Sequence, residues 1–330
     1  MKKNVRALGL CSGGLDSQLA VCVLREQGIE VEIIVFDSPF YNPAPAIKAA
    51  EQLGVRLHVI DFTKEITGLV NDPPHGFGSC MNPCIDCHAL MFKRAGEMML
   101  EQGFDFIFTG EVLNQRPMSQ NRRSLGIVAK DSSFGDLVLR PLSAQLLEPT
   151  KPEREGWVDR EQLLDLSGRS RKPQFALAEK YGVKEYPSPA GGCRLTEPQF
   201  SERLADLKKH EGLDDSRDLE LLRYGRHFRL ESGIKLILGR YASDNAAIEE
   251  LINDGDLVLI PADLPGPTAV LPGSASDDDI KTSASILVRY IKVPDDSQVA
   301  IKIRQGSAER ILEAAAMTEN AVNAMLVAKT

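Results

Sequence analysis

Near its start the chain reads VRALGLCSGGLDSQLA at residues 5–20, and this stretch decides the fold. Residues 5–10 are a short apolar run, which is typical of a buried parallel strand. Residues 16–27 place apolar side chains at helical spacing. Between them, Gly13 and Gly14 allow a ligand to approach the main chain closely. A strand, a glycine turn and a helix in this order predict an anion site, because free amide groups and the helix dipole point at the turn.

The alternation of strand and helix continues through the first 200 residues. Buried strands are expected at residues 31–36, 55–60, 104–108 and 138–141, and helices at residues 43–53, 88–102 and 172–181. Strands that alternate with helices predict a parallel sheet with helices on both faces. We therefore expect a doubly wound α/β domain at residues 1–200, with its ligands at the carboxyl edge of the sheet.

The pattern changes after about residue 200 to short apolar runs separated by turns, which predicts a smaller α+β domain at residues 201–330. A chain of 330 residues is long enough for two domains. The net charge of −8 argues against indiscriminate binding to nucleic acid. No stretch approaches the roughly 20 apolar residues of a membrane helix, so we expect a cytoplasmic protein with no membrane partner.

The glycine turn offers a complete set of groups for a nucleotide phosphate. Gly13 and Gly14 supply backbone amides, Ser12 and Ser17 supply hydroxyls, and Asp16 is suited to hold Mg²⁺ against the phosphates. The loop has no lysine and matches neither the Walker A motif nor the GxGxxG fingerprint. A purely structural glycine turn is the alternative, but the flanking strand and helix favour the phosphate site. The candidate ligands of the nucleotide are Ser12, Gly13, Gly14, Leu15, Asp16 and Ser17.

The motif SGGLDS resembles the signature of the PP-loop ATP pyrophosphatases, a family that includes GMP and asparagine synthetases and the tRNA thiolation enzymes. This resemblance implies that ATP is cleaved to AMP and pyrophosphate, that a substrate oxygen is adenylated, and that Asp16 acts in catalysis. It also implies that Phe36 lies near the adenine.

The segment TGEVLNQ at residues 109–115, with SQ at residues 119–120, resembles the TGE-x-x-x-Q segment of the tRNA 4-thiouridine synthetases, and LRPL at residues 139–142 matches their next strand. Gly110, Glu111 and Gln115 are therefore expected at the nucleotide. Lys172 resembles a lysine that faces the phosphates in relatives, although a solvated charge pair with Arg171 is an equal alternative.

Four of the six cysteines form a second candidate site. Cys80, Cys84 and Cys87 lie within eight residues, and a proline- and glycine-rich loop at residues 186–193 presents Cys193. A [4Fe–4S] cluster on Cys84, Cys87 and Cys193, with Cys80 as a further candidate ligand, resembles the sites of the cluster-dependent tRNA thiolases. Two alternatives stay open: a zinc site, and a metal-free site where Cys193 carries a persulfide that another cysteine, such as Cys87, resolves.

The second domain resembles the small RNA-binding domain of NFACT proteins at residues 224–245. Basic residues there are candidates to line an RNA backbone, and two aromatic residues are candidates to stack on bases. They are Arg223, Arg226, His227, Arg229, Lys235 and Arg240, with Tyr224 and Phe228. A strand pair with a charged outer face is the alternative.

Together, these resemblances imply an ATP-dependent tRNA sulfurtransferase. ATP and Mg²⁺ would activate a uridine carbonyl oxygen, and sulfur from a donor such as a cysteine desulfurase or sulfide would replace AMP. Glu111 and Asp86 are candidates to handle a proton. Two other functions are considered: a PP-loop amidotransferase or sulfur-insertion enzyme for a small molecule, and a non-catalytic RNA-binding iron–sulfur protein. The modified nucleoside and its position are not specified by these motifs.

Overall fold

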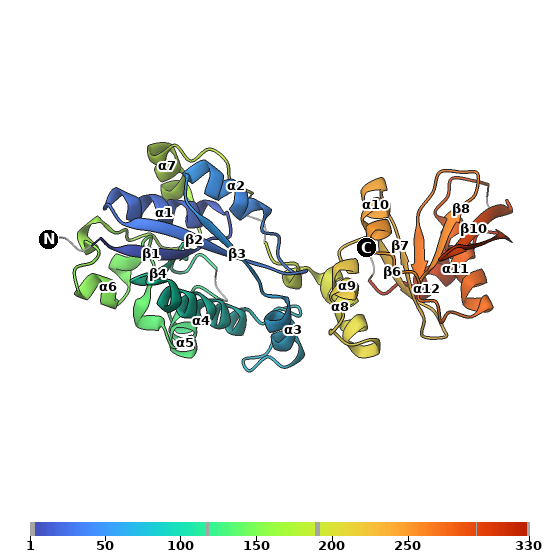
Figure 1. Cartoon of the computed structure of the whole chain (residues 1–330), viewed down its shortest axis with the longest axis horizontal. Helices are drawn as coiled ribbons and strands as arrows, with labels where there is room; N and C mark the ends of the chain where they lie inside the picture. Colours follow the sequence, from blue (N-terminus) through green and yellow to red (C-terminus); the bar gives the residue numbers. More distant parts are fainter. Residues whose placement is uncertain (1–3, 117–118, 189–191, 295, 329–330) are drawn as a thin grey trace. The chain divides into compact units, whose positions relative to one another are not determined.

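The computed structural model describes residues 4–116, 119–188, 192–294 and 296–328. The chain divides into two compact units, Met1–Thr196 and Glu197–Thr330 (Figure 1). Each unit has its own sheet.

Within the described residues, the first unit is built on a five-stranded parallel sheet with the strand order β3-β2-β1-β4-β5. The strands are β1 (Arg6–Leu10), β2 (Glu30–Asp37), β3 (Leu57–Asp61), β4 (Phe106–Thr109) and β5 (Val138–Leu139). The central strand β1 has successive neighbours on one side and the later strand β4 on the other. The strand order therefore reverses between β1 and β4, and ligands bind at the carboxyl ends of strands beside such a switch.

Helices cover both faces of this sheet, which confirms the predicted doubly wound α/β fold. Figure 1 shows α1 (Leu15–Glu26), α2 (Ala44–Leu53) and α7 (Lys172–Tyr181) on one face, and α4 (Cys84–Gln102) and α5 (Arg122–Asp131) on the other. The expected helix stops at Gly54, Gly103 and Gly182 are confirmed, since each glycine adopts the left-handed conformation that ends a helix. The remaining helical segments of this unit are α3 (Thr63–Asn71), α6 (Lys151–Arg154), η1 (Gly135–Leu137), η2 (Ala144–Leu146), η3 (Arg160–Gln162) and η4 (Arg194–Thr196).

The core of the first unit fixes α1 against the central strands. Leu15, Leu19 and Leu24 on α1 are at most 1% exposed. Burying a leucine side chain fully contributes roughly 1.5–3 kcal/mol. Gly9 in β1 leaves room for the ring of Phe108 on β4, because a Cβ at Gly9 would lie 2.2 Å from Phe108 Cζ. This packing sets the position of the turn that follows β1.

The second unit is an antiparallel sheet with helices, as the α+β prediction expected. Its described strands have the order β11-β10-β8-β9-β7-β6. The strands are β6 (Arg226–Arg229), β7 (Lys235–Leu238), β8 (Leu257–Pro261), β9 (Ala269–Leu271), β10 (Val299–Gln305) and β11 (Ala308–Ala314). The helices are α8 (Pro198–His210), α9 (Ser216–Leu221), α10 (Ala242–Glu250), α11 (Asp277–Arg289) and α12 (Glu319–Met325). None of the helices in the described part of the chain has the length and apolar character needed to cross a bilayer.

Candidate active site

The loop between β1 and α1 has a conformation that glycine alone satisfies at its centre. Gly13 has a φ angle of +77°, and a Cβ there would lie 2.2 Å from the carbonyl carbon of Pro45. Gly14 is the N-cap of α1, and its side-chain position meets only Ser12 Oγ, at 3.4 Å. No side chain caps the first turn of α1. The amide groups at the start of this helix are therefore suited to an anion.

Hydrogen bonds within the first unit hold the loop rigid. Gln18 Nε2 donates to Gly13 O and to Glu185 O, both at 2.9 Å, and Gln52 Nε2 donates to Gln18 Oε1 at 2.7 Å. The Ser17 hydroxyl donates to Gly14 O at 2.8 Å. The Ser17 hydroxyl, which was predicted to bind a phosphate, thus donates its proton inside the loop. Sequence reasoning missed Gln18, because a glutamine on a helix carries no motif signal.

The segment after β4 packs directly on this loop. A Cβ at Gly110 would lie 2.5 Å from Ser17 N and from the carbonyl carbon of Asp16. Gly110 therefore brings the two predicted motifs into contact, and any larger residue would push the TGE segment away from α1.

Asp16 is held with one oxygen occupied and one without a partner. Gln115 Nε2 donates to Asp16 Oδ2 at 2.7 Å, and Arg171 Nη2 lies 3.7 Å from the same oxygen. Gln174 Nε2 donates in turn to Gln115 Oε1 at 3.0 Å. Asp16 Oδ1 is buried and has no hydrogen-bond partner among the described residues. A buried carboxylate oxygen without a partner fits a divalent cation, for which oxygen is the preferred ligand.

Two predicted nucleotide ligands lie differently from expectation. Lys172 is exposed at the start of α7, and it is Arg171 that approaches Asp16. The Phe36 ring is buried and packs against Phe62, with ring centroids 4.8 Å apart. The placement of an adenine near Phe36 and of phosphates near Lys172 stays a prediction.

Glu111 is the centre of a buried ionic network. Arg140 Nε donates to Glu111 Oε2 at 2.9 Å, and His88 Nδ1 lies 3.1 Å from Glu111 Oε1. Burial raises the pKa of Glu111, but the positive charge of Arg140 and the hydrogen bond from His88 outweigh it, so the pKa lies below its usual value. Glu111 is therefore an ionised anchor for its neighbours, a role that does not suit a proton carrier at neutral pH.

Three of the predicted cysteines lie near Tyr41, which is partly buried. The Tyr41 hydroxyl lies 2.9 Å from Cys87 Sγ, and the main chain of Tyr41 forms a β-bridge with Cys193. Burial raises the pKa of Tyr41 well above its usual value, and the nearby cysteines Cys87, Cys193 and Cys84 raise it further. We call Tyr41, Cys84, Cys87 and Cys193 the thiol cluster. Sequence reasoning missed Tyr41, since only the fold brings residue 41 to this place.

The thiol cluster differs in detail from a metal site. Among the described residues, no three or more histidines, cysteines, aspartates or glutamates are arranged to hold a metal ion. Neither the [4Fe–4S] nor the zinc prediction is shown by this arrangement. Burial raises the pKa of the Cys87 thiol, and the hydrogen bond with Tyr41 opposes that rise. Residues 189–191 of the loop predicted to present Cys193 lie outside the described residues.

Asp86, next to Cys87, belongs to a separate pair. His75 Nδ1 lies 2.6 Å from Asp86 Oδ1, and His75 N donates to Asp86 Oδ2 at 3.1 Å. The hydrogen bond with Asp86 raises the pKa of His75. Asp86 therefore fixes the segment that precedes α4, and its predicted role in proton transfer stays a prediction.

In the second unit, several predicted RNA contacts are buried or already paired. Phe228 is fully buried, and burial lowers the pKa of His227 well below its usual value, so this histidine is neutral. Arg229 pairs with Asp206 and Glu211. Burial lowers the pKa of Lys235 to about 8. The predicted stacking by Phe228 is therefore wrong, because its ring is part of the core, and Arg229 is not a free cation.

A different group of the second unit is accessible. Arg226 Cζ lies 4.4 Å from the centroid of the Tyr290 ring, and Tyr241 is 65% exposed. With Arg240, these residues line a cavity of about 320 Å³. Aromatic rings beside guanidinium groups are suited to unstacked bases and their phosphates. We call Arg226, Arg240, Tyr241 and Tyr290 the aromatic pocket.

Two family models match the chain, one over the phosphate loop and one over the aromatic pocket. Residues 3–145 match the family model "Thiamine biosynthesis protein (ThiI)", and residues 225–325 match "NFACT protein RNA binding domain". The first match lies within the first unit, and the second match lies within the second unit. The resemblances stated from the motifs are thereby confirmed, since both the phosphate loop and the aromatic pocket fall within the matched residues or at their edge.

Individual relatives match part of the chain. The tRNA-specific 2-thiouridylase MnmA of Sulfurimonas denitrificans is 36% identical over 123 residues, which are 34% of this chain and 36% of that protein. A probable tRNA sulfurtransferase of Thermoanaerobacter sp. is 31% identical over 148 residues, which are 42% of this chain and 37% of that protein. The matched region thus spans little more than a third of these relatives. A 4-thiouridine synthetase solved as an RNA complex with bound ATP is similar at 21% identity and a TM-score of 0.39, over 66% of this chain and 52% of that chain.

Proposed function

We propose that this protein is an ATP-dependent tRNA sulfurtransferase that thiolates a uridine. The observation that carries the proposal is a connected set of contacts in the first unit. Gly110 packs on the phosphate loop at Asp16, the next residue Glu111 binds His88, and His88 follows Cys87 of the thiol cluster. A phosphate site and a cluster of thiols on adjoining residues are what activation by ATP followed by sulfur transfer requires. The similarity to thiouridylases and sulfurtransferases supports the same function.

In the first step, a uridine carbonyl oxygen attacks the α-phosphorus of ATP and pyrophosphate leaves. The amides of Gly13 and Gly14 would stabilise the charge that builds on the departing pyrophosphate. Asp16 Oδ1 would hold Mg²⁺, which supplies positive charge at the phosphates. Gln115 keeps the Asp16 carboxylate turned toward the loop, since it binds the other oxygen.

In the second step, sulfur replaces AMP. A donor of the cysteine desulfurase class would leave a persulfide on Cys193. Its terminal sulfur attacks the adenylated carbon, and AMP departs with the electrons of the C–O bond. A thiolate from Cys87 or Cys84 then attacks Cys193 Sγ, which releases the thiolated base and leaves a disulfide. A dithiol reductant restores both thiols.

The persulfide and iron–sulfur versions of this proposal are distinguished by one preparation. Protein purified without oxygen should be colourless and should contain a persulfide on Cys193, as detected by mass spectrometry. A brown protein whose visible absorption disappears in Cys84→Ala would instead establish the cluster. Cys22→Ala is the matched control, because Cys22 lies on α1 outside the thiol cluster.

The tRNA partner is proposed from the NFACT-type domain and its aromatic pocket. The alternative of a small-molecule substrate predicts pyrophosphate release that does not need RNA. The alternative of a non-catalytic RNA-binding protein predicts no pyrophosphate release with any RNA.

Pyrophosphate release with and without tRNA tests the function. The wild-type protein should release pyrophosphate only when ATP, Mg²⁺ and unmodified tRNA are all present. Asp16→Asn should lower the rate at least 100-fold, because the neutral amide cannot hold the cation. Asp263→Asn, an exposed site in the second unit, is the charge-matched control. Equal rates for the two variants would contradict the assigned role of Asp16.

A further inference from the structure

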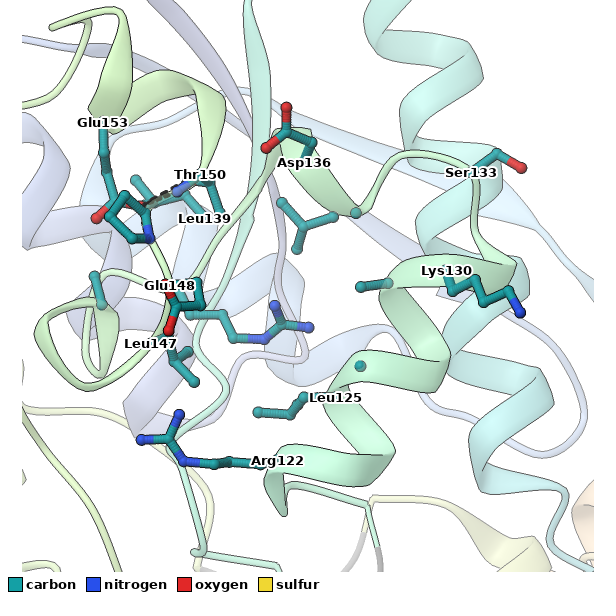
Figure 2. A pocket seen from close by; sticks show the side chains of 17 residues that line it. Arg122, Leu125, Lys130, Ser133, Asp136, Leu139, Leu147, Glu148, Thr150 and Glu153 are labelled. Atoms are coloured by element: carbon teal, nitrogen blue, oxygen red, sulfur yellow. Dashed lines mark hydrogen bonds between the residues drawn. The ribbon is translucent and has the colours of Figure 1, made fainter.

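The first unit has a cavity along α5 that is separate from the phosphate loop and the thiol cluster. It has a volume of about 550 Å³ and is bounded by α5, by the chain around β5, and by residues 144–153. Figure 2 shows Arg122 and Leu125 on α5 facing Leu147 and Glu148 across the cavity, whereas the Lys130 side chain extends away from them. A cavity of this size is in the range that holds a small ligand or one nucleotide.

The cavity is lined by a buried arginine, Arg140, that has one nitrogen hydrogen-bonded and another without a partner among the described residues. Arg140 is 7% exposed and lines the cavity, and its Nε donates to Glu111. The Nη2 atom is buried and has no hydrogen-bond partner among the described residues. Leaving a charged donor buried and unpaired is costly, so a partner from outside the chain is expected. Guanidinium groups favour phosphate as that partner, because two of their N–H groups match two phosphate oxygens.

Two further cations flank the cavity. Arg122 is exposed, and its Nη2 donates to the neutral carbonyl oxygen of Leu146 at 2.7 Å. Lys130 is exposed in the last turn of α5. Their exposed positions suit a ligand that arrives from solvent with negative charge.

The carboxylates around the cavity are mostly occupied. Asp136 accepts two hydrogen bonds from Arg154, at 2.9 and 2.8 Å. Glu153 closes the capping box of α6 through Thr150 and also pairs with Arg160. Glu148 is exposed at the rim. The carboxylates of Asp136 and Glu153 are thus paired with arginines, and the remaining wall is apolar through Leu125, Leu139, Leu147, Ala129 and Ala144.

We propose that this cavity, which we call the α5 cavity, binds one nucleotide of the RNA substrate, with its phosphate on Arg140 and Arg122 and its base against the leucines. This inference rests on the proposed function and adds a contact that the phosphate loop and the aromatic pocket do not supply. Because Glu111 links Arg140 to His88 beside Cys87, RNA held here would be bound next to the residues that transfer sulfur.

Binding of tRNA to the full chain at several KCl concentrations tests the proposal. Arg122→Gln and Lys130→Gln should each weaken binding about 3- to 10-fold, and each should lower the slope of log K against log salt by about 1. Arg123→Gln is the matched control, because Arg123 is an exposed neighbour on α5 that does not line the cavity. Arg140→Lys should weaken binding at least 10-fold, since lysine lacks the paired donors. Loss of Arg140 also disturbs Glu111, so the Arg122 and Lys130 variants decide the outcome where Arg140→Lys does not fold.

Two results would overturn the proposal. One is that Arg122→Gln and Lys130→Gln bind tRNA as Arg123→Gln does. The other is that inorganic phosphate or uridine monophosphate binds the wild-type protein and loses affinity in Arg122→Gln while tRNA binding is unchanged, which would make this a site for free nucleotides. ATP-dependent pyrophosphate release is measured in parallel. Its absence in the wild type would contradict the proposed function, whereas a normal rate together with unchanged tRNA binding in the variants would contradict the α5 cavity alone.

Discussion

At the scale of single residues, the site depends on two kinds of position. At some, only glycine fits against a neighbouring backbone, and at others a buried polar atom has no hydrogen-bond partner among the described residues. Gly13 and Gly110 are places where the backbone of one segment touches that of another. Asp16 Oδ1 and Arg140 Nη2 are buried polar atoms without partners among the described residues. The first kind of position makes the shape of the phosphate site, and the second kind marks where an external cation or anion completes the structure.

Gly13→Ala should reduce ATP binding at least 10-fold and destabilise the fold by about 1–3 kcal/mol, because its methyl group would collide with the Pro45 backbone at a positive φ angle. Gly14→Ala is the control, since its side-chain position is nearly open. Calorimetric titration with ATP and unfolding in urea measure the two effects. Similar losses in both variants would show that the close contact at Pro45 is not what requires glycine.

Tyr41→Phe should raise the pKa of the Cys87 thiol further. Burial already raises this pKa, and the Tyr41 hydroxyl is the group that opposes the rise. The rate of Cys87 alkylation by iodoacetamide, followed by mass spectrometry from pH 7 to 11, should therefore be lower at each pH. Tyr181→Phe is the control, because the Tyr181 hydroxyl donates to Glu26, whereas the Tyr41 hydroxyl pairs with Cys87. A pH profile of alkylation identical to that of the wild type would show that Tyr41 does not affect the pKa of Cys87.

At the scale of elements, the Glu111 network ties α4 to the ends of β4 and β5. Glu111 follows β4, Arg140 follows β5, and His88 is in the first turns of α4. The sequence predicted each of these elements but gave no reason for their charges to meet. It placed the start of the helix at residue 88, whereas α4 begins at Cys84, which puts Cys84 and Cys87 in its first turn.

The Glu111 network should make stability depend on acid pH. The pKa of Glu111 is lower in the folded protein than the usual value of 4.5 for a glutamate. As pH falls below about 4.5, the unfolded chain takes up this proton first, so the stability from Glu111 is present above that pH and is lost as pH falls toward the folded pKa. Glu111→Gln should lower the stability at pH 7 and flatten the loss between pH 5 and 3, as measured by urea unfolding. An unchanged acid slope would show that Glu111 does not titrate with folding.

At the scale of the whole molecule, the proposed chemistry belongs to the first unit, whereas the proposed RNA contacts belong to both units. The phosphate loop, the thiol cluster and the α5 cavity belong to the first unit, and the aromatic pocket belongs to the second. A chain with a net charge of −8 that binds tRNA needs local positive sites of this kind, because its average field repels phosphate.

Tyr241→Ala should weaken tRNA binding by about 5- to 10-fold in the full chain and leave ATP binding unchanged, because stacking on one aromatic ring contributes roughly 1–3 kcal/mol per base. Ile311→Ala removes a comparably exposed apolar side chain, 64% against 65%, from the edge strand β11 and should have no effect. Fluorescence anisotropy with labelled tRNA measures the difference. Equal binding by both variants would exclude Tyr241 as a base contact.

The sequence by itself determined the parallel sheet, the phosphate loop after its first strand and the candidate cysteines, because apolar periodicity and a strand–glycine–helix order are local properties of the chain. Only the tertiary structure decided which side chains complete the sites. Gln115 reaches Asp16 across 99 positions and Tyr41 reaches Cys87 across 46. The burial of Phe228 and the unpartnered Nη2 of Arg140 are likewise results of packing. Contacts between residues this far apart depend on how strands and helices are stacked, and no short window of sequence contains that information.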